Sequence, residues 1–249
     1  MHLSKLFHIP LQHFYLQLFR HSEAEALQVK VLEGKKAILG DKHHETLNAM
    51  ESLGYSYQLL GKYKKAEELH RVVYKERSEQ MGPDQPHTLI SMGHLGSTYF
   101  CQGRYKEAEE MQLKVLEGRK AKLGADHSYT LIAMGHLAVT YCSQGRYPES
   151  EKLHVHVMDA RIKELGERHE TSLAAMAHVA NVYRMQRRLQ EAEDLQQRIL
   201  KARQQLKIQE SDGGSNFETL KNKRDLAATY ATKGFYKEAE KLQVEVLEG

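Results

Sequence analysis

The sequence predicts an all-α solenoid, a stack of antiparallel helix pairs that repeats along most of the chain. The segment from Ser91 to Glu110 returns almost unchanged from Ala133 to Lys152, 42 residues later. The composition also favours helices, because Leu, Glu, Lys, Ala and Gln dominate, Trp is absent and only 4 Pro occur among 249 residues. A period of this length is typical of helical units that bury their apolar faces against one another.

The first helix of each unit is expected from a stripe of apolar residues. Met92, Leu95, Gly96 and Tyr99 follow the spacing i, i+3, i+4 and i+7, which places them on one face of an α-helix. Gly103 then ends the helix after about 14 residues. The same stripe recurs at steps of 42 residues in Met50, Leu53 and Tyr57, in Met134, Leu137 and Tyr141, and in Met176, Val179 and Tyr183.

The second helix of each unit begins after the glycine turn. Tyr105, Ala108, Met111 and Val115 lie on its inner side, and the helix runs for about 18 residues to a Leu-Gly stop. Each unit is therefore a helix, a tight turn, a longer helix and a short loop. The stops recur at residues 39–40, 81–82, 123–124 and 165–166.

These signals divide the chain into repeats with irregular ends. Residues 207–218 lack the Leu-Gly stop and contain Gly213-Gly214, so we expect a flexible insertion there, either tolerated or acting as a hinge. The expected parts are a degenerate N-terminal helix or cap at 1–20, the second helix of a partial repeat at 21–43, repeats at 44–85, 86–127, 128–169 and 170–206, the insertion at 207–218, and a truncated repeat at 219–249.

The last repeat stops inside its second helix. An uncovered apolar end is unfavourable for a solenoid, which requires a polar outer face at each end. We therefore expect either that the chain belongs to a longer array or that it self-associates through its exposed end repeats.

Composition and charge exclude several classes of function. A net charge of +3 is too mild to indicate a nucleic-acid or membrane-surface partner. Only 2 cysteines occur, Cys101 and Cys142, so no disulfide framework can form and a reducing, cytoplasmic location is expected. No apolar run approaches about 18 residues, so no membrane span is expected.

The order Met-x-x-Leu-Gly-x-x-Tyr, followed by Gly-x-Tyr-x-x-Ala, resembles the tetratricopeptide repeat (TPR) over about residues 20–249. The unit of 42 residues and the Leu-Gly-x-x-His loops resemble the kinesin-light-chain subtype. The phrase EAEEMQLKVLEGRKAKLG is similar to TPR arrays at the C-termini of fungal NOD-like receptor proteins. The resemblance implies a TPR superhelix with a concave groove that binds a peptide.

One departure from the family lies in the loops before the first helices. The family usually has His-Pro there, and only Pro86 keeps the proline; the other loops read His43-His44, His127-Ser128 and His169-Glu170. We expect these loops to be looser without any change of fold.

The resemblance also implies which residues contact a ligand. In TPR arrays the side of the first helix opposite the buried stripe lines the groove. The predicted groove residues are Asn48, Ser52, Tyr55, Ile90, His94, Ser97, Ile132, His136, His178, Asn181, Arg184 and Asp225.

Three of these residues form a ladder of histidines, His94, His136 and His178. Two interpretations stay open: the histidines are solvated copies produced by duplication, or they bond a peptide backbone, since a neutral imidazole offers one donor and one acceptor. A metal site is disfavoured, because adjacent helices lie roughly 9–10 Å apart and zinc ligands need distances of about 2 Å. No cofactor is expected.

No motif in the sequence indicates catalysis. HHETLN and RHETSL both lack the second histidine of the His-Glu-x-x-His zinc motif, and neither a glycine-rich phosphate loop nor Gly-x-Ser-x-Gly occurs. His154 and His156 are two residues apart on a helix, which predicts surface packing. We therefore expect a non-catalytic protein.

The sequence predicts a protein–protein interaction scaffold that binds a partner peptide or helix in its groove. Other readings stay open: a kinesin-light-chain-like cargo adaptor, a regulatory fragment of a larger NTPase or enzyme, and a self-associating scaffold. If the histidine ladder meets an acidic peptide, affinity should rise as the pH falls through about 6.5.

Overall fold

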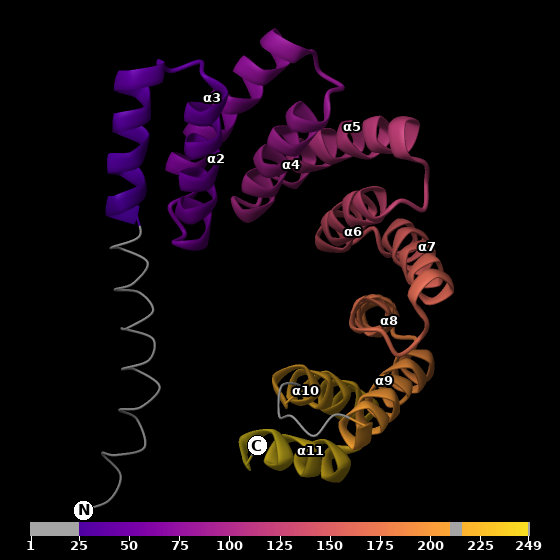
Figure 1. Ribbon diagram of the computed structural model, residues 1–249. Helices are drawn as coiled ribbons and strands as arrows, with labels where there is room; N and C mark the ends of the chain where they lie inside the picture. The colour runs from indigo at the N-terminus through magenta and orange to yellow at the C-terminus, as the bar shows by residue number, and fades with distance from the viewer. Residues whose placement is uncertain (1–24, 210–215, 249) are drawn as a thin grey trace, which may run out of the picture. The chain divides into compact units, whose positions relative to one another are not determined.

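The computed structural model describes residues 25–209 and 216–248, and all of its regular elements in these ranges are α-helices (Figure 1). The chain forms two compact units, Met1–Lys122 and Leu123–Gly249. Each is a stack of antiparallel helix pairs, which confirms the all-α solenoid that the sequence predicts. The N-terminal cap expected at residues 1–20 lies outside the described residues.

The part of the first unit that the structure describes contains two and a half helix pairs. This part begins with a helix over residues 25–39. α2 packs against α3, and α3 packs against α4 of the next pair, so α3 lies between two first helices. The other elements are α2 (His44–Leu59), α3 (Tyr63–Met81), α4 (Pro86–Cys101) and α5 (Tyr105–Leu123).

The second unit continues the same pattern over three pairs. α7 packs against both α6 and α8, and α9 packs against both α8 and α10. The elements are α6 (Ser128–Ser143), α7 (Tyr147–Leu165), α8 (Glu170–Met185), α9 (Leu189–Gln209), α10 (Asn216–Lys233) and α11 (Tyr236–Glu248).

The insertion expected at residues 207–218 is narrower in the structure. α9 continues to Gln209 and α10 begins at Asn216, so both ends of the expected insertion are helical. The sequence offers no Leu-Gly stop that would end α9 earlier. The remaining residues, 210–215, lie outside the described ranges.

The turns inside the helix pairs depend on a left-handed residue. Gly103 has φ 75° and Gly145 has φ 77°, conformations that glycine adopts without a Cβ penalty. At the equivalent place in the fourth repeat, Arg187 adopts φ 62° and is the only described residue other than glycine with a positive φ. The fourth repeat therefore keeps the left-handed turn although arginine replaces the glycine.

Histidine side chains cap three of the first helices. The Nδ1 atoms of His43, His127 and His169 accept hydrogen bonds from the backbone N–H groups two residues on, at 3.3, 3.2 and 3.2 Å. Before α4, where Pro86 is the first helical residue, Gln85 makes no such bond. The loops without proline therefore each contain a side-chain cap, which the sequence analysis did not foresee.

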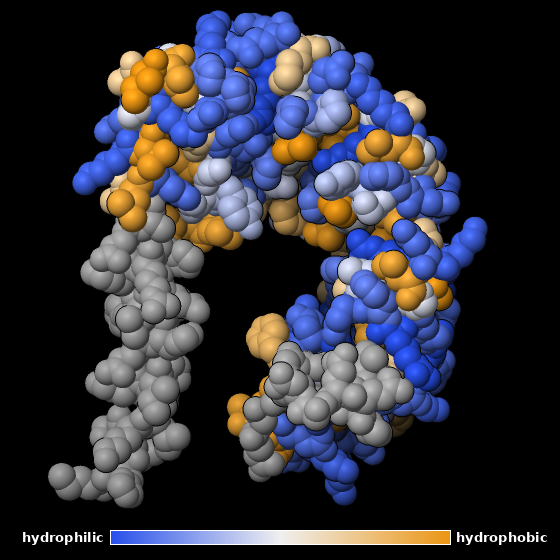
Figure 2. Space-filling model, viewed as in Figure 1, coloured by the Kyte–Doolittle hydropathy of each residue, from blue (hydrophilic) through white to orange (hydrophobic). Residues whose placement is uncertain are grey.

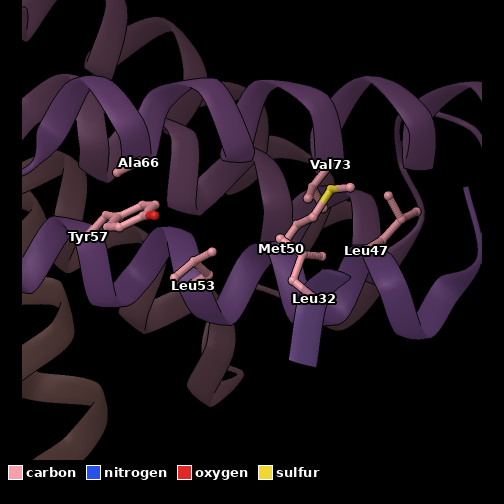
Figure 3. Close-up of a cluster of buried hydrophobic side chains, with 7 residues drawn as sticks. All are labelled: Leu32, Leu47, Met50, Leu53, Tyr57, Ala66 and Val73. Carbon is pink, nitrogen blue, oxygen red and sulfur yellow. The ribbon is translucent and has the colours of Figure 1, made fainter. Parts of the chain in front are cut away.

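The predicted apolar stripes form the cores between the helices. In the first unit, Leu47, Met50, Leu53 and Tyr57 of α2 meet side chains from α3 and from the helix of residues 25–39 (Figure 3). In the second unit, side chains of α8 and α9 form an equivalent cluster of Leu173, Met176, Val179, Ala180, Leu195, Ile199 and Ala202. The 3.6-residue periodicity thus identified the buried faces correctly.

The helix of residues 25–39 has one apolar face that the described residues leave open. Figure 2 shows orange side chains along this helix, and Leu27, Val31 and Ile38 are exposed. Val31 is 53% exposed, whereas Val73, its equivalent one repeat later, is 0% exposed because α2 covers it.

Candidate functional site

The candidate site is the exposed side of the first helices, which we call the first-helix face. It lies opposite the buried stripe on α2 and α4 in the first unit and on α6, α8 and α10 in the second. All twelve predicted groove residues lie on these helices, and all have exposed or partly exposed side chains. The two parts of the face are described separately below.

Apolar side chains open to solvent are prominent on the first unit's part of the face. Tyr55 of α2 is 50% exposed and meets His94 of α4 edge-on, with ring centroids 6.4 Å apart. Leu59 and Ile90 are exposed beside them. Ser52 bonds its own helix, donating to the carbonyl of Asn48 at 3.0 Å. This surface combines apolar contact area with polar groups at its edges.

His94 is paired with a second histidine that the sequence analysis did not identify. The ring centroid of His70, from α3, lies 5.5 Å from that of His94, and His70 is 1% exposed. The Thr98 hydroxyl donates to the carbonyl of His94, so its oxygen accepts from Nδ1 of His70, at 2.9 Å in both bonds. The proton of a neutral His70 therefore sits on Nδ1.

Both members of this pair favour the neutral state. Burial, and then the nearby His94, lower the pKa of His70 to about 4. Burial also lowers the pKa of His94, helped by Arg77 and Arg119 and opposed by the carboxylate of Glu51. At neutral pH the pair is an uncharged contact between consecutive repeats.

The second unit contains an equivalent pair. The rings of His154 in α7 and His178 in α8 stack with centroids 5.1 Å apart and an interplanar angle of 7°. His154 is 4% exposed, so the prediction of surface packing for it was wrong: it faces the next repeat, and burial and His178 lower its pKa to about 4. His178 itself is exposed, yet crowding by the protein, Lys221 and Arg161 lower its pKa.

The histidine ladder is therefore not uniform. The residues equivalent to His70 and His154 in the other two repeats are Gln112 and Gln196. His136 is exposed on α6. Two members of the ladder pack on buried histidines of the preceding helix, which neither sequence interpretation included.

The sequence analysis also missed a ladder of arginines on the second helices. Arg77, Arg119, Arg161 and Arg203 are spaced by the same 42 residues, so the repeat step, applied to the second helices, would have found them. Arg203 is 2% exposed and holds both carboxylate oxygens of Glu170, with Nη2 to Oε2 at 2.7 Å. The position is thus a buried cation with a defined partner.

Asn48 is part of such an arginine site. The guanidinium of Arg77 donates to Oδ1 of Asn48 at 2.6 Å and to Oε1 of Glu51 at 2.9 Å, both on α2. It also reaches Oγ of Ser91 at 2.7 Å and the carbonyl of His87 at 3.2 Å, both on α4. Asn48 therefore orients a buried cation in addition to lying on the face.

The remaining predicted residues of the second unit form a polar edge. Arg184 donates to Oδ1 of Asn181 at 2.8 Å on α8. On α10, Asp225 lies 3.9 Å from Arg224. On α6, Ile132 and Val139 are apolar and exposed. This part of the face has the same mixture of apolar and polar groups as the first.

Two properties of the described residues concern metal binding and membrane insertion. No group of three or more His, Cys, Asp or Glu side chains there could hold a metal ion. No described helix has the length and apolar composition needed to cross a bilayer.

A family model of the tetratricopeptide repeat matches residues 13–75, 88–153 and 129–205, which together cover more than half of the chain. The chain belongs to the tetratricopeptide repeat family. No curated protein matches it.

Solved TPR structures show the same fold. A putative kinesin light chain from Podosopora anserina with nearly identical TPR-like repeats is 24% identical over 83% of this chain and 95% of its own, with a TM-score of 0.70. BtubC (BKLC) from P. vanneervenii is 16% identical over 93% of this chain and 90% of its own, with a TM-score of 0.72. The apo form of RapI is 13% identical over 99% and 97%, with a TM-score of 0.62.

These matches confirm the TPR fold of the kinesin-light-chain-like type. The narrower resemblance to fungal receptor arrays stays a prediction. Within the TPR array, the twelve groove residues lie where the family resemblance expects ligand contacts, and their binding role is also still a prediction.

Proposed function

We propose that this TPR array is a non-catalytic interaction scaffold that binds a peptide segment of a partner protein on its first-helix face, in a reducing compartment such as the cytoplasm. The supporting observation is that exposed apolar side chains recur on neighbouring first helices within each unit. Tyr55 and Ile90 are 50% and 37% exposed in the first unit, and Ile132 and Met185 are 38% and 39% exposed in the second. Single exposed apolar residues are common on solvated surfaces, whereas several on one face offer contact area to an extended or helical chain.

The polar groups of the face would select the register of the bound segment. His94 and His178 are neutral at pH 7, so each offers one donor and one acceptor to a peptide backbone. Because their pKa values are lowered, any gain in affinity for an acidic peptide should develop below pH 6.5, lower than the sequence alone predicts. The affinity for a short peptide is expected to be modest, because the peptide loses entropy on binding.

A display selection with random twelve-residue peptides tests the proposal directly. Selected peptides should lose about tenfold or more in affinity when Ile90→Asp places a charge on the first-helix face. Val72→Asp is the matched control, because Val72 is 45% exposed on the second helix α3. Equal losses in both variants, or no selected peptide at all, would contradict the proposal.

Self-association is a separate candidate that the same material can test. Leu247 near the end of α11 is 86% exposed, which favours contact through the end repeat. Light scattering across a hundredfold concentration range should then show dimers that Leu247→Glu abolishes. A monomer at every concentration rejects this candidate. The cargo-adaptor and NTPase-fragment readings stay predictions.

A further inference from the structure

The arginine ladder contains one site that completes its own ion pair and one that does not. Arg77 satisfies its guanidinium inside the protein, through Asn48 and Glu51 on the preceding helix and through Ser91 and the carbonyl of His87 on the following helix. The carboxylate of Glu51 balances the buried charge. This site is a template for what an arginine at this position binds.

Arg161 occupies the same position two repeats later. Its Nη1 donates to the carbonyl of Thr171 at 3.1 Å, and Thr171 is two repeats after His87, whose carbonyl accepts from Arg77 at 3.2 Å. The two guanidinium groups thus share one equivalent backbone acceptor, although Arg77 is buried and Arg161 is partly exposed. The comparison can therefore be made residue by residue.

The side chains that serve Arg77 are all replaced around Arg161. The position of Glu51 is taken by Gly135, that of Asn48 by Ile132 and that of Ser91 by Ala175. None of the three offers a side-chain acceptor. Among the described residues, the carbonyl of Thr171 is the only hydrogen-bond acceptor of Arg161.

The surroundings of Arg161 favour an anion. Its pKa is lowered by burial, with no carboxylate acting against it. Arg161 and Lys221 both lower the pKa of His178, so three nitrogen-bearing side chains share one positive region. A Cβ built on Gly135 would meet no atom within 4 Å, so space is open where the glutamate side chain would begin.

We propose that Arg161 forms a carboxylate-binding subsite at the edge of the first-helix face, filled by an acidic side chain of the bound peptide in the place that Glu51 takes beside Arg77. This inference rests on the proposed function and names the chemistry of the segment bound there. The array supplies the carboxylate itself in one repeat and takes it from the partner in another. Lys221 adds positive charge to the subsite, and the neutral His178 can donate a hydrogen bond.

A matched pair of variants isolates the carboxylate. Gly135→Glu restores the residue that serves Arg77, so it should fill the subsite from within and compete with a ligand. Gly135→Gln has the same size and similar helix propensity but no charge, so it is the control. Arg161→Gln removes the cation and should behave like Gly135→Glu towards ligands.

The first experiment uses small probes and needs no identified partner. N-acetylglutamate N-methylamide is titrated at millimolar concentration while NMR follows the Arg161 Nε–H and the His178 ring protons. Both signals should shift, and the pKa of His178 should rise, in the native chain and in Gly135→Gln. Both signals should stay fixed in Gly135→Glu, and with the uncharged N-acetylglutamine N-methylamide. In Arg161→Gln, which lacks the guanidinium signal, the His178 ring protons should stay fixed.

Two outcomes of this titration would overturn the inference. One is the absence of any shift in the native chain, and the other is an equal shift in Gly135→Glu. N-acetylalanine, which carries only a terminal carboxylate, distinguishes the source of the anion. A stronger response to it than to the glutamate probe would replace the acidic side chain by a peptide C-terminus and reject the proposal as stated.

The second experiment separates this inference from the proposed function. Peptides from the display selection should contain an acidic residue at one fixed place and lose about tenfold or more in affinity for Gly135→Glu, but not for Gly135→Gln. Peptides that respond to Ile90→Asp but show no acidic preference and bind Gly135→Glu normally would reject the subsite and leave the proposed function standing. A response to the probes without any selected peptide would reject the proposed function alone.

Discussion

The guanidinium of Arg188 donates a hydrogen bond at 2.7 Å to Glu151, which belongs to the preceding helix pair. The same group lies over the ring of Tyr183, 4.1 Å from its centroid. In the first unit, Arg104 likewise reaches Glu67 of the preceding pair at 2.8 Å. The arginine that follows the left-handed turn residue, Arg104 in one turn and Arg188 in the other, thus also links neighbouring repeats.

Removing this link should weaken the stack. We expect Arg188→Lys to lower the free energy of unfolding by about 1 kcal/mol, because a lysine cannot stack flat on Tyr183 and bond Glu151 with a planar fork. Urea unfolding followed by circular dichroism measures the change. Arg198→Lys, at an exposed ion pair with Glu167, is the control and should change stability by less.

The paired histidines predict an acid-labile fold. His70 and His154 have folded pKa values of about 4, below the unfolded value of 6.5, so the unfolded state binds protons first as the pH falls. The stability that each contributes is complete above pH 6.5 and is lost as the pH falls to about 4. The loss is on the order of 3 kcal/mol for each residue.

Two substitutions test this pH dependence. His70→Gln and His154→Gln introduce glutamine, which the chain already has at the equivalent positions Gln112 and Gln196. Together they should flatten the fall in melting temperature between pH 6.5 and pH 4. An unaltered pH profile in the double variant would show that other groups cause the acid lability.

The left-handed turn residue at Arg187 carries a backbone cost. Restoring glycine there should raise the free energy of unfolding by about 0.5–1 kcal/mol, since glycine has no Cβ penalty at φ 62°. Arg187→Ala keeps the penalty and should bring no gain. Thermal melts of the two variants measure their stability changes. A gain in both variants would show that the positive φ of Arg187 is not the cause of the cost.

The ion pair between Arg203 and Glu170 should respond asymmetrically to truncation. Glu170→Ala leaves the buried guanidinium without its counter-ion and should cost about 1–3 kcal/mol, since the Glu170 side chain is itself 57% exposed. Arg203→Met removes the charge and fills similar volume, so its cost should be smaller. Chemical unfolding of both variants measures the difference; a larger cost for Arg203→Met would mean that the packing of the arginine stem dominates.

Much of the fold was predictable because the sequence pattern of each helix recurs in several repeats. The apolar stripe of Met50, Leu53 and Tyr57 was assigned to the core from its spacing alone, and the structure buries all three. The end of α9 was not predicted, because no stop residue marks it. The exposed positions of the face were also predictable, since they lie opposite the stripe.

The candidate site could be predicted only in part. The sequence placed His94 and His178 on the first-helix face from periodicity, which relates residues on one helix. It did not pair them with His70 and His154, because those contacts join two helices whose separation in space no single period specifies.

The sequence by itself determined the repeat length, the helix pairs, the buried stripes and the identity of the exposed residues, because local propensity and periodicity act within one helix. Only the tertiary structure decided which side chains meet across helices. It paired the histidines, gave Arg77 its carboxylate and left Arg161 with a backbone carbonyl. The physical reason is that partners across a helix interface are set by packing distance and burial, which a one-dimensional pattern does not contain.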